Sequence, residues 1–190
     1  MSAEGMAQPP ATSWRRIARR IRVPLGFAFA VLCFWLAQPT WRSIALGGAI
    51  AVCGLAVRAA AAGHVRKDAA LTTTGPYSYT RNPLYLGSLI MALGFAAAGR
   101  SAWMLLAITV FFFAIYWPVI RSEEEYLRAH FPEFADYAQR VPRLLPRFRG
   151  ERGEFSRDLY LRHREYRALL GVLALVGALI VKMYWQESAR

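Results

Sequence analysis

Two stretches of the 190-residue chain hold most of the side chains that could do chemistry. The first, residues 71–87, reads LTTTGPYSYTRNPLYLG and combines tyrosines, a Gly-Pro pair and an Asn-Pro pair. The second starts with Arg121-Ser122-Glu123-Glu124-Glu125 and runs on to the VPRLLP sequence at 141–146. Adjacent carboxylates next to an arginine can bind a cationic group such as an ammonium through charge-assisted hydrogen bonds. We therefore expect a small-molecule site built from both stretches.

Ordinary structural roles also explain several of these residues. Gly75-Pro76 is a common turn pair, and Asn82-Pro83 is typical of a helix N-cap followed by proline in the first turn. Ser122 with Glu125 three residues later fits a capping box, which predicts a helix start at Ser122. This role leaves Glu123 and Glu124 unexplained, so they are the stronger candidates for a binding function.

The composition indicates the elements that must position these residues. Hydrophobic residues make up 56% of the chain and charged residues only 19%. The charges lie between long apolar runs of the length expected for membrane helices. We predict an all-α, polytopic integral-membrane helix bundle of about five transmembrane helices, at residues 23–37, 43–62, 84–98, 102–120 and 168–185. The third and fourth would form a hairpin through Gly99-Arg100-Ser101, which brings the two stretches to one surface.

The basic residues predict the orientation of this bundle. The net charge is +12, and twenty of the 24 Lys and Arg residues fall in the N-terminal segment and the two long loops, against four on the other side. The positive-inside rule therefore places the N-terminus and both long loops in the cytoplasm. There the arginines would contact anionic membrane lipids. No recognition helix or aromatic stacking platform accompanies them, so nucleic acid is not an expected partner, and nothing selects an oligomeric state.

The cysteines and histidines give no sign of a metal site. Cys33 and Cys53 lie within apolar runs, and the three histidines are scattered along the chain. No spacing typical of a zinc or haem site occurs.

The ordered motifs resemble a known superfamily. Gly-Pro-Tyr, then Arg-Asn-Pro-Leu-Tyr-Leu-Gly, then Glu-Glu-x-x-Leu, then Val-Pro-Arg-x-x-Pro, with a transmembrane hairpin between the halves, is similar to the isoprenylcysteine carboxyl methyltransferase and phospholipid methyltransferase superfamily. The match covers about residues 58–146. Each motif is weak alone, whereas the ordered set is specific.

This resemblance implies that S-adenosylmethionine binds between the two stretches and that Arg121 holds the acceptor carboxylate. It divides the chain into a basic cytoplasmic segment (1–22), a four-helix membrane core with a cofactor-binding loop at 63–87 (23–120), a cytoplasmic catalytic and basic segment (121–167), and a fifth helix with its tail (168–190). The cofactor-binding residues that it implies are Leu71, Thr72, Gly75, Tyr77, Asn82, Pro83, Leu84, Tyr85, Glu123 and Glu124.

The sequence departs from the family pattern mainly at the acceptor end. Asn82 stands where the family has a histidine, Ala69 replaces another, and Arg121 lies two residues before Glu123 rather than four. A titratable base would assist methylation of an amine, and Asn82 cannot titrate. The sequence thus favours methylation of the carboxylate of a prenylated or lipid-like acceptor that enters from the bilayer. A phospholipid amine methyltransferase of the same fold and a non-enzymatic lipid-binding scaffold stay open as alternatives.

Overall fold

The computed structural model describes residues 26–66 and 70–188, and every regular element in these ranges is helical. Ala69 and the whole of the predicted basic N-terminal segment (1–22) therefore lie outside the described residues. The elements are a first helix Gly26–Leu36, α2 (Trp41–Ala62), the 3₁₀ turn η1 (Gly75–Ser78), α3 (Pro83–Gly99), α4 (Ala102–Phe111), the π-helical turn η2 (Phe112–Tyr116), α5 (Trp117–His130), α6 (Phe134–Arg140), α7 (Arg157–Arg162) and α8 (Tyr166–Ser188).

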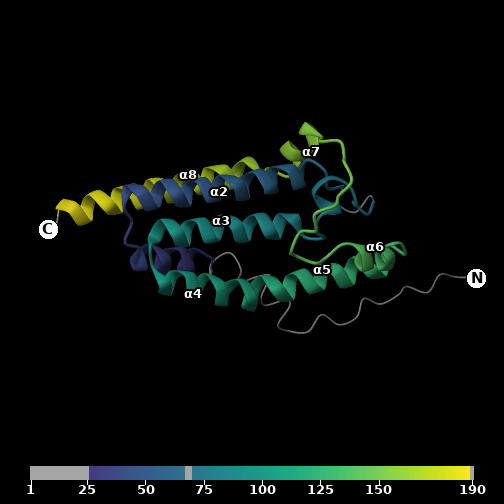
Figure 1. The fold of residues 1–190 in the computed structure, drawn as a ribbon, viewed down its shortest axis with the longest axis horizontal. Coiled ribbons are helices and arrows are strands. Elements are labelled where there is room, and N and C mark those ends of the chain that lie inside the picture. The colour runs from purple at the N-terminus through teal and green to yellow at the C-terminus, as the bar shows by residue number, and fades with distance from the viewer. Residues whose placement is uncertain (1–25, 67–69, 189–190) are drawn as a thin grey trace, which may run out of the picture.

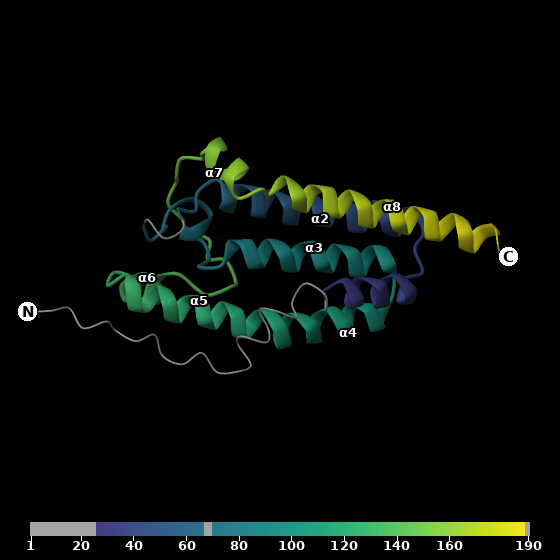
Figure 2. The same cartoon turned by 180° about the vertical axis from the view of Figure 1, so that it is seen from behind.

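The long helices run side by side in layers. Figure 1 shows α8 packed along α2, α3 next to α2, and the continuous helix from α4 to α5 on the far side of α3. The reverse view in Figure 2 shows the same order, with α6 and α7 at one end of the bundle and the turn between α3 and α4 at the other. We call the first the α6 end and the second the Arg100 end.

Three helices are long and apolar enough to cross a membrane, namely α2, the helix Ala102–His130 and α8. Two shorter apolar helices, Gly26–Leu36 and Pro83–Gly99, match the first and third predicted spans. The all-α membrane bundle is therefore confirmed, whereas the number of five spans and the cytoplasmic orientation stay predictions. The start of the first predicted span, at residue 23, lies outside the described residues.

The helix of the fourth predicted span continues beyond Ile120 to His130, while the predicted end of the span itself stays a prediction. Pro118 has no N–H to donate to the carbonyl oxygen of Ala114. The helix is nevertheless not interrupted at Pro118, and a π-helical turn lies just before it. In this turn the backbone N–H of Trp117 bonds to the oxygen of Phe112, five residues back. The shift in hydrogen bonding accommodates the proline, so α5 projects the glutamates as part of a rigid helix.

Glycines let α2 and α3 pack closely enough to fix the start of α3. A Cβ placed on Gly54 would lie 2.6 Å from the backbone oxygen of Gly87, and one on Gly87 would lie 2.7 Å from the oxygen of Gly54. Such contacts are typical of membrane helices that approach through small residues. The first turn of α3, which carries Tyr85, is therefore held at a defined height against α2.

The predicted orientation leads to a direct labelling test. Single cysteines at Arg100 and at Arg149, two exposed positions at opposite ends of the bundle, should react with a membrane-impermeant maleimide from opposite sides of the membrane. The background should have Cys33 and Cys53 replaced by serine, because Cys53 is exposed. Equal labelling of both sites in intact cells would contradict the topology.

Candidate functional site

At the α6 end, Glu124 joins the two stretches that the sequence singles out. Its carboxylate is only 6% exposed. Oε1 accepts a hydrogen bond from Nδ2 of Asn82 at 3.1 Å, and Oε2 accepts one from Nε of Arg143 at 2.9 Å. Nε of Arg81 lies 3.2 Å from Oε1 as an ion pair without hydrogen-bond geometry. A buried carboxylate held by two guanidinium groups and an amide is a structural tie, so Glu124 fixes the loop before α3 to α5.

Asn82 occupies the N-cap position of α3, as predicted, but its side chain forms no capping hydrogen bond. The side chain bonds instead to Glu124 and, at 2.9 Å, to the carbonyl oxygen of Arg143. Pro83 does lie in the first turn of α3, as predicted. The residue that replaces the family's histidine thus holds the loop in place and is buried.

The predicted capping box of Ser122 and Glu125 is also wrong. Both residues lie within α5, which continues from the membrane helix before it. The S-x-x-E pattern signals a helix start only where the preceding chain is not helical. Here the apolar run extends the helix through Ser122, so the pattern has no capping role.

The VPRLLP sequence at 141–146 and its flanks lie along the loop before α3. The hydroxyl of Tyr137 donates to the backbone oxygen of Tyr77 at 2.7 Å, and the backbone N–H of Arg81 donates to the oxygen of Pro142 at 2.9 Å. Nε of Arg147 donates to the oxygen of Ser78 at 2.8 Å. Since a backbone group of the loop takes part in each of these bonds, the later segment holds the loop in one conformation.

Gly75 occupies a position that only glycine fits. Its φ of +60° is in the left-handed region, and a Cβ there would collide with the ring of His64. Its backbone N–H donates to the oxygen of Glu151 at 3.0 Å. The turn that presents Tyr77 therefore depends on the missing side chain.

We expect Gly75→Ala to destabilise this loop by about 1–2 kcal/mol from the left-handed conformation, and further by the collision with His64. Thermal unfolding of the purified variant measures the loss. Gly26→Ala, at a helical glycine with open space around its Cα, is the matched control. An unchanged melting temperature for Gly75→Ala would show that the turn relaxes freely.

Glu123 differs from its neighbour Glu124 in being exposed. Its Oε1 accepts a hydrogen bond from the hydroxyl of Tyr85 at 2.8 Å. The Tyr85 ring packs edge-on against Tyr116 with 5.8 Å between ring centroids. These contacts orient one carboxylate oxygen, and in the part of the chain that the structure describes the other oxygen of Glu123 has no hydrogen-bond or ion-pair partner. An oriented, accessible carboxylate is suited to bind a cation.

Tyr77 lies behind this carboxylate in a buried, charged environment. Burial raises the pKa of its phenol, and the hydroxyl of Tyr137 and the carboxylates of Glu123 and Glu165 raise it further, whereas Arg58 lowers it. Burial likewise raises the pKa of Tyr137. Both phenols therefore stay protonated at neutral pH and can donate hydrogen bonds.

Arg58 and Glu165 were missed as site residues in the sequence, where Arg58 is simply a charge at the end of an apolar run. Nε and Nη2 of Arg58 donate to Oε2 and Oε1 of Glu165 at 3.0 and 2.7 Å. Nη1 donates to Ser88 Oγ and to the carbonyl oxygen of Leu84, so the pair joins α2, α3 and the start of α8. The sequence signal for this pair is a basic residue near the end of one apolar run and an acidic residue just before another.

The remaining predicted residues are spread around this core. Leu71 packs against the cluster of Phe134, Tyr137 and Val141, and Thr72 accepts a hydrogen bond from the backbone of Arg66 at 3.1 Å. Arg121 is exposed on α5. Positions two apart on a helix do not face each other, so Arg121 and Glu123 lie on different faces, and the acceptor role of Arg121 stays a prediction.

Sequence comparisons relate the chain to known proteins. A family model described as phospholipid methyltransferase matches residues 25–133. The cobalt-zinc-cadmium resistance protein CzcN of Cupriavidus metallidurans is 43% identical over 89 residues, which cover 47% of this chain and 41% of that protein. The nickel-cobalt-cadmium resistance protein NccN of Alcaligenes xylosoxydans xylosoxydans is 41% identical over 138 residues, or 63% of each chain. No solved structure matches.

Proposed function

Because the chain belongs to the phospholipid methyltransferase family, we propose that it is an integral-membrane, S-adenosylmethionine-dependent methyltransferase. The acceptor would be the carboxylate of a prenylated or lipid-like molecule. The proposal rests on the different structural roles of two adjacent glutamates. Glu124 ties the loop to α5 from inside, while Glu123 presents an oriented carboxylate beside Tyr85.

The side chains around Glu123 suit the charged groups of this cofactor. Its ammonium would pair with the accessible oxygen of Glu123, and the protonated phenol of Tyr77 would donate to its polar groups. The bound cofactor supplies an electrophilic methyl group on its sulfonium, so the chain need provide only binding and orientation. The residues that would line this site are Leu71, Thr72, Gly75, Tyr77, Asn82, Pro83, Leu84, Tyr85, Glu123 and Glu124. Of these, Glu124 would hold the site together rather than contact the cofactor.

An apolar groove supports an acceptor with a lipid tail. A cavity of about 590 Å³ lies between the first helix and the helix from α4 to η2. Its lining consists of apolar residues only, from Phe29 and Leu36 on one side to Trp103, Leu106 and Phe111 on the other. Tyr116, one helical turn beyond Phe112, packs edge-on against both Phe111 and Tyr85. A tail in this groove would therefore point its headgroup toward Tyr85 and Glu123.

An amine acceptor is the main alternative. Asn82 does not distinguish the two acceptors, because its side chain is buried and bonded to Glu124. Glu123 is exposed and could accept a proton from an ammonium. Arg121, exposed on α5, is the residue that favours a carboxylate, since a guanidinium binds a carboxylate through two parallel hydrogen bonds. Arg58 is already paired with Glu165 in this way.

Labelled S-adenosylmethionine tests the proposal and separates the acceptors. Purified protein in detergent should transfer the methyl group to a prenylated carboxylate and not to a phospholipid amine with equal tail length. Shortening the tail by two methylenes should weaken the apparent affinity for the acceptor by about tenfold, at roughly 0.8 kcal/mol for each buried methylene. Transfer to the amine alone would favour the alternative acceptor, and absence of cofactor binding by calorimetry would favour the scaffold.

The names of the two relatives concern resistance to metals. Within the described residues no three His, Cys, Asp or Glu side chains come close enough to hold a metal ion. We propose that any contribution of this chain to such resistance would act through the methylated product, in line with its family.

A further inference from the structure

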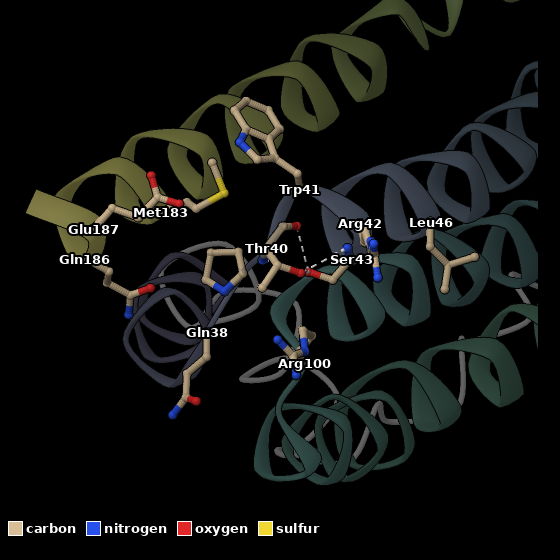
Figure 3. Close-up of a pocket in the computed structure, with 11 residues that line it drawn as sticks. Gln38, Thr40, Trp41, Arg42, Ser43, Leu46, Arg100, Met183, Gln186 and Glu187 are labelled. Atoms are coloured by element: carbon tan, nitrogen blue, oxygen red, sulfur yellow. Dashed lines mark hydrogen bonds between the residues drawn. The ribbon is translucent and has the colours of Figure 1, made fainter. Parts of the chain in front are cut away.

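The Arg100 end holds a second pocket that the proposed methyl transfer does not use. Its volume is about 910 Å³, within the range of small-molecule sites. Figure 3 shows its lining from three parts of the chain, namely the loop and start of α2, the turn between α3 and α4, and the end of α8. The residues that matter most are Arg42, Arg100, Trp41, Gln38 and Gln186.

Hydrogen bonds between these segments make the pocket a rigid feature. Ser43 Oγ donates to the carbonyl oxygen of Ala98 at 2.8 Å, and the backbone N–H of Gln38 donates to the oxygen of Gly99 at 2.7 Å. Lys182 on α8 donates to the carbonyl oxygens of Phe34 and Trp35, at the end of the first helix. The two segments that carry the arginines are therefore fixed relative to each other.

The lining of the pocket carries more positive than negative charge, with Arg42 and Arg100 against Glu187. Among the described residues, neither Arg42 nor Arg100 forms a side-chain hydrogen bond or an ion pair, although Glu187 also lines the pocket. Two guanidinium groups in one pocket repel each other. An anion between them would relieve the repulsion and accept hydrogen bonds from both, and phosphate is an oxyanion that guanidinium groups bind well.

The backbone of Arg100 supports a role for its side chain. This residue ends α3 with a φ of 50°, in the left-handed region where glycine or asparagine is usual. An arginine there carries a conformational cost of about 1–2 kcal/mol. Neither the turn nor the packing gains from the long side chain, since Arg100 is exposed. A strained residue of this kind points to a function at the side chain.

Aromatic residues place this pocket at the depth of lipid headgroups. Trp41 lines it and is 52% exposed, and its ring packs edge-on against Tyr184, with 5.8 Å between centroids. Trp103 and Trp185 are 71% and 61% exposed at the same end of the bundle. Exposed tryptophan and tyrosine are enriched where a membrane protein crosses the interface. A phosphate reaching the two arginines would therefore come from the adjoining leaflet.

We propose that this pocket binds the phosphodiester headgroup of an anionic phospholipid, at the end of the bundle opposite the methyl-transfer site. Arg42 and Arg100 bind the phosphate, while Gln38 and Gln186, which also line the pocket, would offer their amides to the headgroup hydroxyls. The lipid tails lie along the outside of the helices. This site is independent of the chemistry at Glu123 and would exist even if the methyl acceptor were different.

Photoreactive phosphatidylglycerol and phosphatidylcholine with identical tails test the proposal on the full chain in detergent. Cross-linked peptides are mapped by mass spectrometry across a lipid concentration series. Phosphatidylglycerol should label peptides around Trp41 and Trp103 at lower concentration than phosphatidylcholine does. In the Arg42→Gln, Arg100→Gln double variant this labelling should require about thirtyfold more lipid, because each basic residue near an anionic surface contributes on the order of 1 kcal/mol.

Controls in the same experiment assign the effect to this pocket. Labelling of peptides at 147–152 should be unchanged in the double variant, whereas Arg149→Gln, Arg152→Gln should weaken labelling there and leave the Arg100 end unaffected. Equal labelling of the wild type by both lipids, or an unchanged double variant, would overturn the proposal without bearing on methyl transfer. Displacement of the lipid by inorganic phosphate at equal concentration would overturn the lipid as the source of the phosphate.

Discussion

Glu124→Ala should lower the free energy of unfolding by about 3 kcal/mol or more, which is the usual cost of removing one partner from a buried ion pair. The carboxylate is 6% exposed and lies between Arg81 and Arg143. Its loss leaves the nearly buried Arg81 guanidinium without this countercharge, and it also removes one of the two hydrogen bonds of the Asn82 amide. Because the Arg143 side chain is 32% exposed, water would compensate part of the loss there. Chemical unfolding in detergent measures the change.

Glu133→Ala is the matched control, since this glutamate is exposed just before α6 and its removal should change the stability by less than about 0.5 kcal/mol. Glu124→Ala should also release the loop before α3 and so weaken cofactor binding indirectly. If both variants unfolded at the same denaturant concentration, the ion pairs around Glu124 would not be what joins the loop to α5.

Glu123→Gln should weaken binding of S-adenosylmethionine by roughly ten- to a hundredfold, because a hydrogen bond to a charged group contributes about 1.5–3 kcal/mol. The amide keeps the shape of the side chain and can still accept a hydrogen bond from Tyr85, but it has no charge for the cofactor's ammonium. The melting temperature should stay within a degree or two of the wild type, since Glu123 is exposed. Isothermal titration calorimetry measures the affinity.

Glu125→Gln provides the comparison, because it removes the same charge two positions further along α5, on a different face of the helix. A larger loss of affinity in Glu125→Gln than in Glu123→Gln would mean that the other face of α5 forms the site. The pair Glu123→Gln and Glu124→Ala also distinguishes binding from folding, since only the second should lower the stability.

Local patterns in the sequence determine where the helices form and where α3 begins, and they indicate the family. Long apolar runs fix where helices form, because a chain in the bilayer must satisfy its own backbone hydrogen bonds. The Asn-Pro pair marks the start of α3, and the order of the motifs indicates the family. These features depend on neighbours in the chain, so they can be read without knowing the fold.

The tertiary structure alone decided which chemical role each residue can take. Glu123 and Glu124 are adjacent and identical, and only the docking of the loop before α3 against one face of α5 makes the second a buried tie and leaves the first exposed. The same holds for Arg58, whose partner Glu165 lies 107 residues away. Successive helix positions differ by about 100° in direction, so the packing of α5 against the loop, and not the identity of the residues, determines which glutamate can meet a ligand.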